Sequence, residues 1–332
     1  MPPPLPKMCH SMLVDTRISR RLTHVLCSAA YNIHTIHLFT IDNLQPVIIP
    51  WTVVGVCNAL AGPAVTSQSS PDAWGILSRA PQALFWMWLS ILTFAIANQR
   101  LPDAVQEDAI NKSWRALPSG RLSTQQAQTL LLFVVFTLFV IGTWMGTSYM
   151  TALVIVLSYL YNDLGGADLH WSIRNLINAF AMVVANTGTT LVCVQDGPSR
   201  SDSPFCPKGI MWALLQASLV MTTLQVQDLR DQEGDKARKR STMPVDIGDS
   251  FTRWSVAITV TVWSLYCPAF WSADALGTTI VTLLGAWLSL KVLLRRNVES
   301  DRKSWKLWGL WTMTIFMLPL YSRPDALRQL LR

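Results

Sequence analysis

Charged residues are scarce in this chain of 332 residues: they make up 14% of it, against roughly a quarter in soluble domains. A large soluble helical protein needs a polar face on most of its helices, and such faces are rare here. Hydrophobic residues reach 51%, and there are 15 tryptophans, a residue that favours the membrane–water interface. The composition therefore argues against a soluble enzyme and predicts an integral membrane protein.

Sequence motifs of several common protein classes are also missing. The chain has no GxxxxGK[ST] phosphate-binding loop, no GxSxG nucleophile elbow and no HExxH zinc motif. Its six cysteines form no CxxC pair, and no nucleic-acid-binding motif is visible. Cys193 and Cys206 flank one predicted loop, where either a disulfide or two buried thiols would fit. The first ten residues, MPPPLPKMCH, lack the apolar stretch of a signal peptide.

Long apolar stretches are present, and they predict nine spanning helices, since a bilayer crossing takes about 20 mostly apolar residues. The nine cover residues 36–64, 81–99, 127–145, 147–161, 172–194, 209–226, 254–271, 275–294 and 305–321. Pro46 and Pro50 interrupt the first stretch, so it is expected to begin as an interfacial piece. We therefore expect an all-α, polytopic membrane protein. Its nine-helix domain would span residues 36–323, after a cytosolic tail and interfacial segment (1–35) and before a short tail (324–332).

The distribution of positive charge supports this count. With nine spans, 21 of the 27 Lys and Arg residues lie on one side of the membrane. The other side holds only Arg79, Arg200, Lys208, Arg323, Arg328 and Arg332. Cytoplasmic loops carry the Lys/Arg excess, so the first side is predicted to be cytosolic. The net charge of +7 then reflects topology rather than nucleic-acid binding, and the endoplasmic reticulum is the expected membrane.

Two polar segments interrupt the apolar pattern, one after the second predicted span and one after the sixth. The first carries Asn98, Asp103, Glu107 and Asp108, then Asn111, Lys112, Arg115 and Arg121. The second carries Asp228, Asp231, Glu233 and Asp235, then Lys236, Arg238, Lys239 and Arg240. Both follow an even-numbered span, so both are predicted on the cytosolic side. Their equivalent places suggest two related helical halves.

Acids followed by bases suit a site for a divalent cation and a phosphate group. If the second segment stays helical, Asp228, Asp231 and Asp235 are three and four residues apart and share one helix face. Neighbouring carboxylates repel, and a divalent cation removes that repulsion. Mg²⁺ takes one or two carboxylates and bridges to phosphates, while Lys and Arg bind phosphate oxygens. One such cluster would indicate an ordinary solvated loop, but two at matching positions favour a diphosphate site.

The polar segments contain EDAINKSWRALPSGRLS and DLRDQEGDKARKRSTMPV. The first is similar to an acid followed by N-K-P-x-R-P-x-x-S-G, and the second to D-x-x-D-x-E-G-D followed by a base and T-x-P. These are the motifs of the UbiA superfamily of intramembrane prenyltransferases, which the chain resembles. LFTIDNLQPVIIPWTVVG, NQRLP and YNDLGGAD resemble its fungal branch, which includes terpene cyclases. The chain departs from the family pattern in having Gln99 for a common Asp, Ser113 and Ala116 for two prolines, and Lys239 where many relatives have Gly.

The resemblance implies nine helices around a central cavity and a Mg²⁺-dependent terpene cyclase. Such an enzyme ionises a prenyl diphosphate, here preferentially geranylgeranyl diphosphate with farnesyl diphosphate as the second choice, and its carbocation closes rings. The alternative is a prenyltransferase that passes the chain to an aromatic acceptor, and a non-enzymatic transporter or scaffold is a third interpretation. The expected partners are the prenyl diphosphate and the lipid bilayer, with no nucleic acid and no evident protein partner.

The same resemblance assigns roles to individual residues. The catalytic residues, which would also bind the metal, are Asn98, Glu107, Asp108, Asp228, Asp231 and Asp235. The diphosphate-binding residues are Asn111, Lys112, Arg115, Arg240, Tyr161, Asn162, Arg174 and Asn175. For the last four, packing at helix ends is an equally good interpretation. Most tryptophans in or near the spans are expected to face lipid or the membrane interface.

Overall fold

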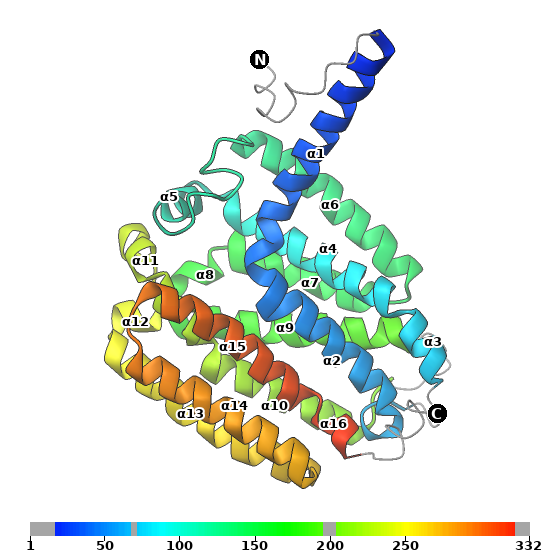
Figure 1. Ribbon diagram of the computed structural model, residues 1–332, viewed down its shortest axis with the longest axis vertical. Coiled ribbons are helices and arrows are strands. Elements are labelled where there is room, and N and C mark those ends of the chain that lie inside the picture. The colour runs from blue at the N-terminus through cyan, green and yellow to red at the C-terminus, as the bar shows by residue number, and fades with distance from the viewer. Residues whose placement is uncertain (1–16, 68–71, 195–203, 323–332) are drawn as a thin grey trace.

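Helices form almost all the regular structure of the computed structural model, which describes residues 17–67, 72–194 and 204–322 (Figure 1). They are α1 (Arg17–Asn43), η2 (Leu44–Ile48), α2 (Ile49–Leu60), η3 (Gly62–Ala64), α3 (Ala73–Ser78), α4 (Ala80–Gln99), α5 (Pro102–Asn111), α6 (Thr124–Trp144), α7 (Ser148–Asn162), α8 (Gly166–Leu169), α9 (Trp171–Cys193), α10 (Pro207–Thr223), η4 (Leu224–Arg230), α11 (Gln232–Arg238), α12 (Met243–Asp246), α13 (Asp249–Trp271), α14 (Ala275–Leu294), α15 (Val298–Phe316) and α16 (Leu318–Tyr321). Within these ranges, Thr66 and Phe205 form a single isolated β-bridge. The all-α prediction is confirmed.

In the described part of the chain, six helical segments are long and apolar enough to cross a membrane. They are Thr23–Leu60, Ala80–Gln99, Thr124–Trp144, Trp171–Cys193, Pro207–Arg230 and Ala275–Leu294. A seventh apolar helix, Ser148–Asn162, is shorter. Helices also cover the seventh and ninth predicted spans, as α13 and α15, but neither is among the six. The membrane class is supported, whereas the count of nine spans stays a prediction.

The first predicted span is part of a long helical rod that changes its hydrogen-bonding pattern at a proline. α1 begins at Arg17, inside the predicted N-terminal segment, and continues through the π-helical turn η2 into α2. Pro46 lies in that turn, where it has no N–H to donate and its ring crowds the preceding turn. α15 packs closely on the turn, since a Cβ on Gly309 would lie 2.4 Å from the Pro46 Cα. The end of α1 is thereby fixed beside α15.

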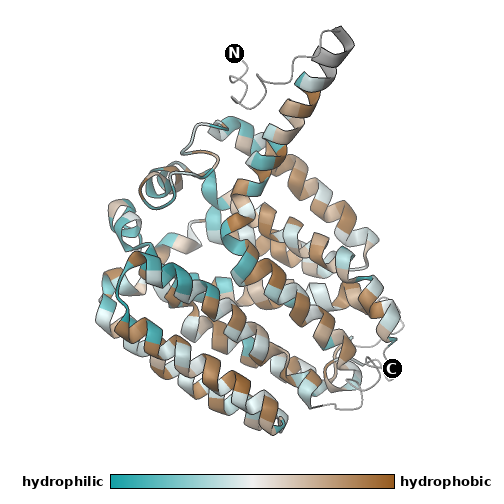
Figure 2. Cartoon of the chain, in the orientation of Figure 1, coloured by the Kyte–Doolittle hydropathy of each residue, from teal (hydrophilic) through white to brown (hydrophobic). Residues whose placement is uncertain are grey.

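The central helix of the bundle is α9, which packs against α2, α4, α7 and α10. α13, α14 and α15 pack side by side along one flank, at the lower left of Figure 1. The short helices α5 and α11 pack against each other at one end of the bundle. Hydrophilic residues gather at that same end, while the long helices are mainly hydrophobic (Figure 2). The two polar segments of the sequence therefore meet at a single end of the bundle.

Many tryptophans lie in the core rather than at the membrane surface. Seven are almost completely buried: Trp51, Trp86, Trp212, Trp271, Trp305, Trp308 and Trp311. Several make ring contacts, as Trp212 does with Phe316 and Trp271. Trp144, by contrast, is 76% exposed. The expectation that most would face lipid is wrong for these seven, because helix packing in the bundle uses their large area.

Cys193 and Cys206 are free thiols, so no disulfide joins them. Cys193 is buried, and Cys206 caps α10, since its sulfur accepts a hydrogen bond from the Gly209 N–H at 3.3 Å. The buried-thiol interpretation is therefore confirmed for Cys193. Most of the loop between the two residues lies outside the described ranges.

Candidate active site

A cavity opens at the hydrophilic end of the bundle, among α1, α4, α7, α9, η4 and α15. The volume of the cavity is about 150 Å³. Along α4 the lining changes from Asn98 to Met87, and along α9 from Arg174 to Ala185. Eleven helical residues span roughly 16 Å, so the cavity extends from a polar mouth well into the apolar bundle. Its charged lining residues are Asp42, Glu107, Lys112, Arg115, Arg174, Arg230, Asp231 and Arg240.

The first polar segment supplies α5 and the turn that follows it. Pro102 starts α5, and the helix turns Glu107 and Asp108 inward, where they are 6% and 2% exposed. Arg115 Nη1 donates to both carboxylate oxygens of Asp108, at 2.8 and 2.9 Å. Burial raises the pKa of Asp108, and Arg115 and Lys112 offset only part of this effect. Lys112 reaches across to the second segment and donates to Asp231 Oδ2 at 2.7 Å.

The second polar segment is not one continuous α-helix, so its three aspartates do not share a face as predicted. Asp228 belongs to the 3₁₀-helix η4, Asp231 is the junction residue (φ −107°, ψ 7°), and Asp235 belongs to α11. A 3₁₀-helix alone would keep residues i and i+3 on one face. The aspartates separate because the backbone leaves the helical conformation at Asp231, before α11 begins. Asp228 accepts two hydrogen bonds from Arg174, at 2.7 and 2.8 Å. Asp231 points instead towards Lys112 and Arg230, whose charges hold its pKa below the ordinary value although burial opposes them.

Among the four predicted aspartate ligands, only Asp235 makes no ion pair within the described part of the chain, although Arg174 and Arg240 lie near enough for their charges to act on it. It is 2% exposed, and its buried Oδ2 has no hydrogen-bond partner there. Burial, with the nearby charge of Asp228, raises the pKa of Asp235 to about 7. A buried acceptor without a donor, beside other carboxylates, fits a cation ligand. Among the described residues, no three His, Cys, Asp or Glu side chains yet lie close enough to hold a metal ion.

The basic run after Asp235 divides between the cavity and the surface. Arg238 and Arg240 turn inward and approach Glu107 Oε2 at 3.0 and 3.4 Å. Lys236 and Lys239 are exposed. Lys239 ends α11 with φ +58°, a left-handed conformation that glycine adopts more readily.

Tyr161 and Arg174 take part in the same network. The Tyr161 hydroxyl accepts from Arg174 Nε and from Arg240 Nη2, both at 3.1 Å. Both Tyr161 and Arg174 line the cavity. Their interpretation as site residues is therefore favoured over simple packing at helix ends.

The predicted asparagines lie in three different settings. Asn98 lines the cavity and donates to Asn162 Oδ1 at 3.0 Å, which holds α4 to α7. Asn111 lies outside the cavity lining and links the two polar segments: its Nδ2 donates to the Asp231 carbonyl at 3.0 Å, and its Oδ1 accepts from the Gly234 N–H at 3.2 Å. Asn175 is 1% exposed, and neither atom of its amide has a partner among the described residues.

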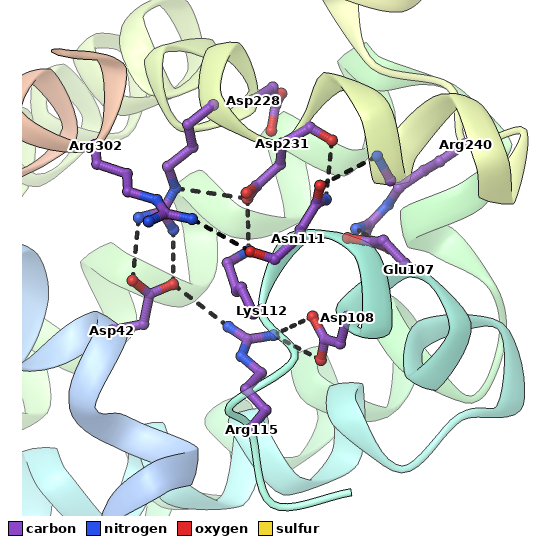
Figure 3. A network of polar contacts seen from close by, with 12 residues as sticks. Asp42, Glu107, Asp108, Asn111, Lys112, Arg115, Asp228, Asp231, Arg240 and Arg302 are labelled. Carbon is purple, nitrogen blue, oxygen red and sulfur yellow. Dashed lines mark hydrogen bonds and ion pairs between the residues drawn. The ribbon is translucent and has the colours of Figure 1, made fainter. Parts of the chain in front are cut away.

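Sequence reasoning missed Asp42 and Arg230, which also line the cavity. Figure 3 shows Asp42 within the network of polar contacts. Arg230 donates to both oxygens of Asp42, at 3.0 and 2.7 Å. A signal was available, because Asp42 is the only charged residue in the predicted span 36–64. Charges within membrane spans are unfavourable and usually functional.

Comparison with known proteins finds a matching family and several similar sequences. The sequence profile of the UbiA prenyltransferase family matches residues 55–314. Fumagillin beta-trans-bergamotene synthase of Aspergillus fumigatus is 27% identical over 87% of this chain and 92% of its own length. Somaliensene A/B synthase of Streptomyces somaliensis is 30% identical over 82% of this chain and 89% of its own.

A solved structure shares the fold. A UbiA homologue from Archaeoglobus fulgidus, bound to DMAPP and Mg²⁺, has a TM-score of 0.57 at 14% identity. The similarity covers 86% of this chain and 98% of that one.

Proposed function

We propose that this chain, which belongs to the UbiA prenyltransferase family, is a Mg²⁺-dependent terpene cyclase that ionises a prenyl diphosphate and cyclises the carbocation. Membership makes it an enzyme acting on prenyl substrates, so the transporter or scaffold interpretation is set aside. The observation that carries the proposal is the cavity, with acids and bases from both polar segments at its mouth and apolar walls behind them. A diphosphate would remain at the mouth while its prenyl chain lies in the bundle.

The ion pairs at the mouth suggest how such a substrate is held. Asp108, Asp228 and Asp231 are each neutralised by a base. The residues that would hold Mg²⁺ are Asn98, Glu107, Asp108, Asp228, Asp231 and Asp235. When bound, the metal supplies positive charge that stabilises the departing diphosphate. Once these acids take new partners, the N–H donors of Arg115, Arg174 and Lys112 become free to bind diphosphate oxygens.

The apolar part of the cavity would then direct the reaction. The bond between the first prenyl carbon and the diphosphate oxygen breaks, and the electron pair leaves with the diphosphate. The carbocation remains among Trp51, Phe94 and Trp305, whose aromatic faces attract cations. Their packing keeps water away during ring closure, so an internal double bond attacks the cation; the sequence ends when the cyclic cation loses a proton, which gives a hydrocarbon, or takes up one water and loses a proton, which gives an alcohol.

A prenyltransferase is the alternative, and the cavity lining offers an observation in its favour. Ser90, Ser158 and Asn178 place hydroxyl and amide groups among the apolar side chains. Such groups could hydrogen-bond to the hydroxyls of an aromatic acceptor, whereas a cyclase needs no second substrate.

Substrate length and location complete the proposal. We prefer geranylgeranyl diphosphate, with farnesyl diphosphate as the second choice, because of the resemblance to fungal diterpene cyclases. We also propose an endoplasmic-reticulum protein whose cavity mouth faces the cytosol. The Lys/Arg excess in the predicted loops at that end supports this orientation.

The test is an incubation without an acceptor. Purified protein in liposomes, given Mg²⁺ and either geranylgeranyl or farnesyl diphosphate, is expected to release pyrophosphate and form a cyclic hydrocarbon or alcohol, identified by mass spectrometry. Removing Mg²⁺ with a chelator should stop both signals. Product that forms only after an aromatic acceptor is added would support the transferase instead.

Gly234→Ala is expected to lower turnover about 10- to 100-fold, the usual effect of losing an outer hydrogen-bond partner of a metal site. A Cβ at residue 234 would lie 2.1 Å from Asn111 Nδ2 and push apart the link between α5 and α11. The measurement is pyrophosphate release as a function of Mg²⁺ concentration, and half-maximal activity should require more Mg²⁺.

The matched control for this change is Gly285→Ala, whose Cβ would lie 2.0 Å from Ser264 Oγ, between α13 and α14. It should lower the unfolding temperature and leave the Mg²⁺ requirement unchanged. Equal Mg²⁺ requirements for both variants and the wild type would contradict the role given to the Asn111 link.

A further inference from the structure

Asp42 occupies a position between the two polar segments. It lies in the last turn of α1, directly before the π-helical turn that Gly309 of α15 packs against. Arg230 of η4 binds it through two parallel N–H···O bonds, and Arg115 Nη2 approaches it at 3.4 Å. Asp42 therefore contacts one arginine of each polar segment, from a helix that belongs to neither segment.

These contacts join the two segments through a continuous series of ion pairs. Arg115 binds Asp108 at one end, and Arg230 lies 3.5 Å from Asp231 at the other. Asp42 connects the two arginines, and Figure 3 shows its contact with Arg115. Removing its charge would leave Arg115 and Arg230 fixed only by acids that are themselves proposed to turn towards a metal.

Both arginines retain an unused donor. Arg115 and Arg230 line the cavity, yet the buried Nε–H of each makes no hydrogen bond within the described residues; Arg230 Nε has only the 3.5 Å ion-pair contact with Asp231 Oδ2. Buried donors without partners are unfavourable and indicate a ligand that satisfies them. A diphosphate carries several acceptor oxygens and binds arginine well. Arg230, Lys112 and Arg115 all surround Asp42, so three cations disfavour a metal ion at this carboxylate.

We propose that Asp42 is a positioning residue: it orients Arg115 and Arg230 so that their N–H donors meet the diphosphate, and it does so without binding the metal. The inference rests on the proposed function, because it assumes a diphosphate ligand at this mouth. Loss of the Asp42 carboxylate should therefore weaken the binding of diphosphate but leave the binding of Mg²⁺ unchanged. A purely structural role would change stability alone.

The test compares Asp42→Asn with Asp301→Asn. Asp301 is 2% exposed in its side chain and binds Arg253 through two N–H···O bonds, outside the cavity lining, so the same substitution breaks a similar pair elsewhere. Asp42→Asn is expected to raise both the KM for the prenyl diphosphate and the Kd for inorganic pyrophosphate about 10- to 100-fold. The Mg²⁺ concentration that gives half-maximal activity should stay within about twofold of the wild-type value. Asp301→Asn should lower the unfolding temperature and leave KM and Kd unchanged.

Two further variants keep the inference testable if Asp42→Asn does not fold. Arg230→Lys keeps the charge but loses the parallel pair, so it should raise the same two constants. Asp42→Glu keeps the carboxylate and should recover part of the pyrophosphate affinity. Pyrophosphate affinity at the wild-type value in Asp42→Asn or in Arg230→Lys would overturn the inference, as would a raised Mg²⁺ requirement with unchanged KM.

The two proposals fail in different ways. Wild-type turnover of a prenyl diphosphate tests the proposed function alone. The pyrophosphate comparison, made by calorimetry on purified protein with Mg²⁺, tests Asp42 even where no product forms.

Discussion

Asp228→Asn is expected to lower turnover about 100- to 1000-fold and to lower the unfolding temperature as well. The turnover effect follows because a carboxylate proposed to hold Mg²⁺ loses its charge, and single electrostatic contributors of this kind are worth about 100- to 1000-fold. The stability effect follows because Arg174, 5% exposed, is left without its bidentate partner. Breaking a buried ion pair from one side costs about 3–5 kcal/mol. Pyrophosphate release and thermal unfolding in detergent measure the two effects separately.

A second substitution distinguishes these effects. In Asp228→Asn combined with Arg174→Gln both charges of this buried pair are removed, so most of the stability lost by breaking the pair should return. Turnover should not return, because both the proposed metal ligand and a proposed diphosphate donor are gone. Turnover of Asp228→Asn within tenfold of the wild type would show that Asp228 does not hold the metal.

The sequence predicts the two ends of a helix well where the helix is apolar along its whole length. α14 begins and ends at the predicted residues 275 and 294. α13 and α15 begin earlier than predicted, at Asp249 and Val298, because their first turns are polar and hydropathy does not detect them. Capping explains where α15 begins, since the Asn297 side chain accepts a hydrogen bond from the Ser300 N–H. Local hydrogen bonding, rather than hydrophobicity, decides these ends.

The candidate site was predictable as a set of residue types but not as a set of contacts. Acids and bases after even-numbered spans were expected at one end, and α5 and α11 do meet there. The sequence could not show that the helix breaks at Asp231, between η4 and α11, where Asp231 pairs with Lys112 and Asp228 pairs with Arg174. Pair formation depends on side chains far apart in sequence, and only the folded arrangement determines it.

Asp235→Asn is expected to lower turnover without lowering the unfolding temperature, whereas Asp228→Asn should lower both. Turnover should fall about 100-fold or more, because a proposed Mg²⁺ ligand is lost. Without Mg²⁺, however, the variant should unfold at the wild-type temperature or about 2–4 °C above it, the shift that about 1 kcal/mol produces in a large domain. Asp235 is buried, its Oδ2 has no partner among the described residues, and Asp228 lies near it, so the ionised carboxyl is unfavourable until a cation arrives.

The decisive measurement is therefore thermal unfolding with and without Mg²⁺ plus pyrophosphate. A ligand that binds only the folded state raises the unfolding temperature, so the wild type should gain stability from this mixture and Asp235→Asn should gain much less. Asp163→Asn is a suitable control, because Asp163 pairs with Arg100 and does not line the cavity; its response to the mixture should equal that of the wild type. If Asp235→Asn is less stable than the wild type without Mg²⁺, then the buried carboxylate already has a favourable partner, and its assignment as a cation ligand is wrong. If it is more stable and no longer responds to the mixture, the protein keeps an unfavourable buried charge at Asp235 because the metal requires it.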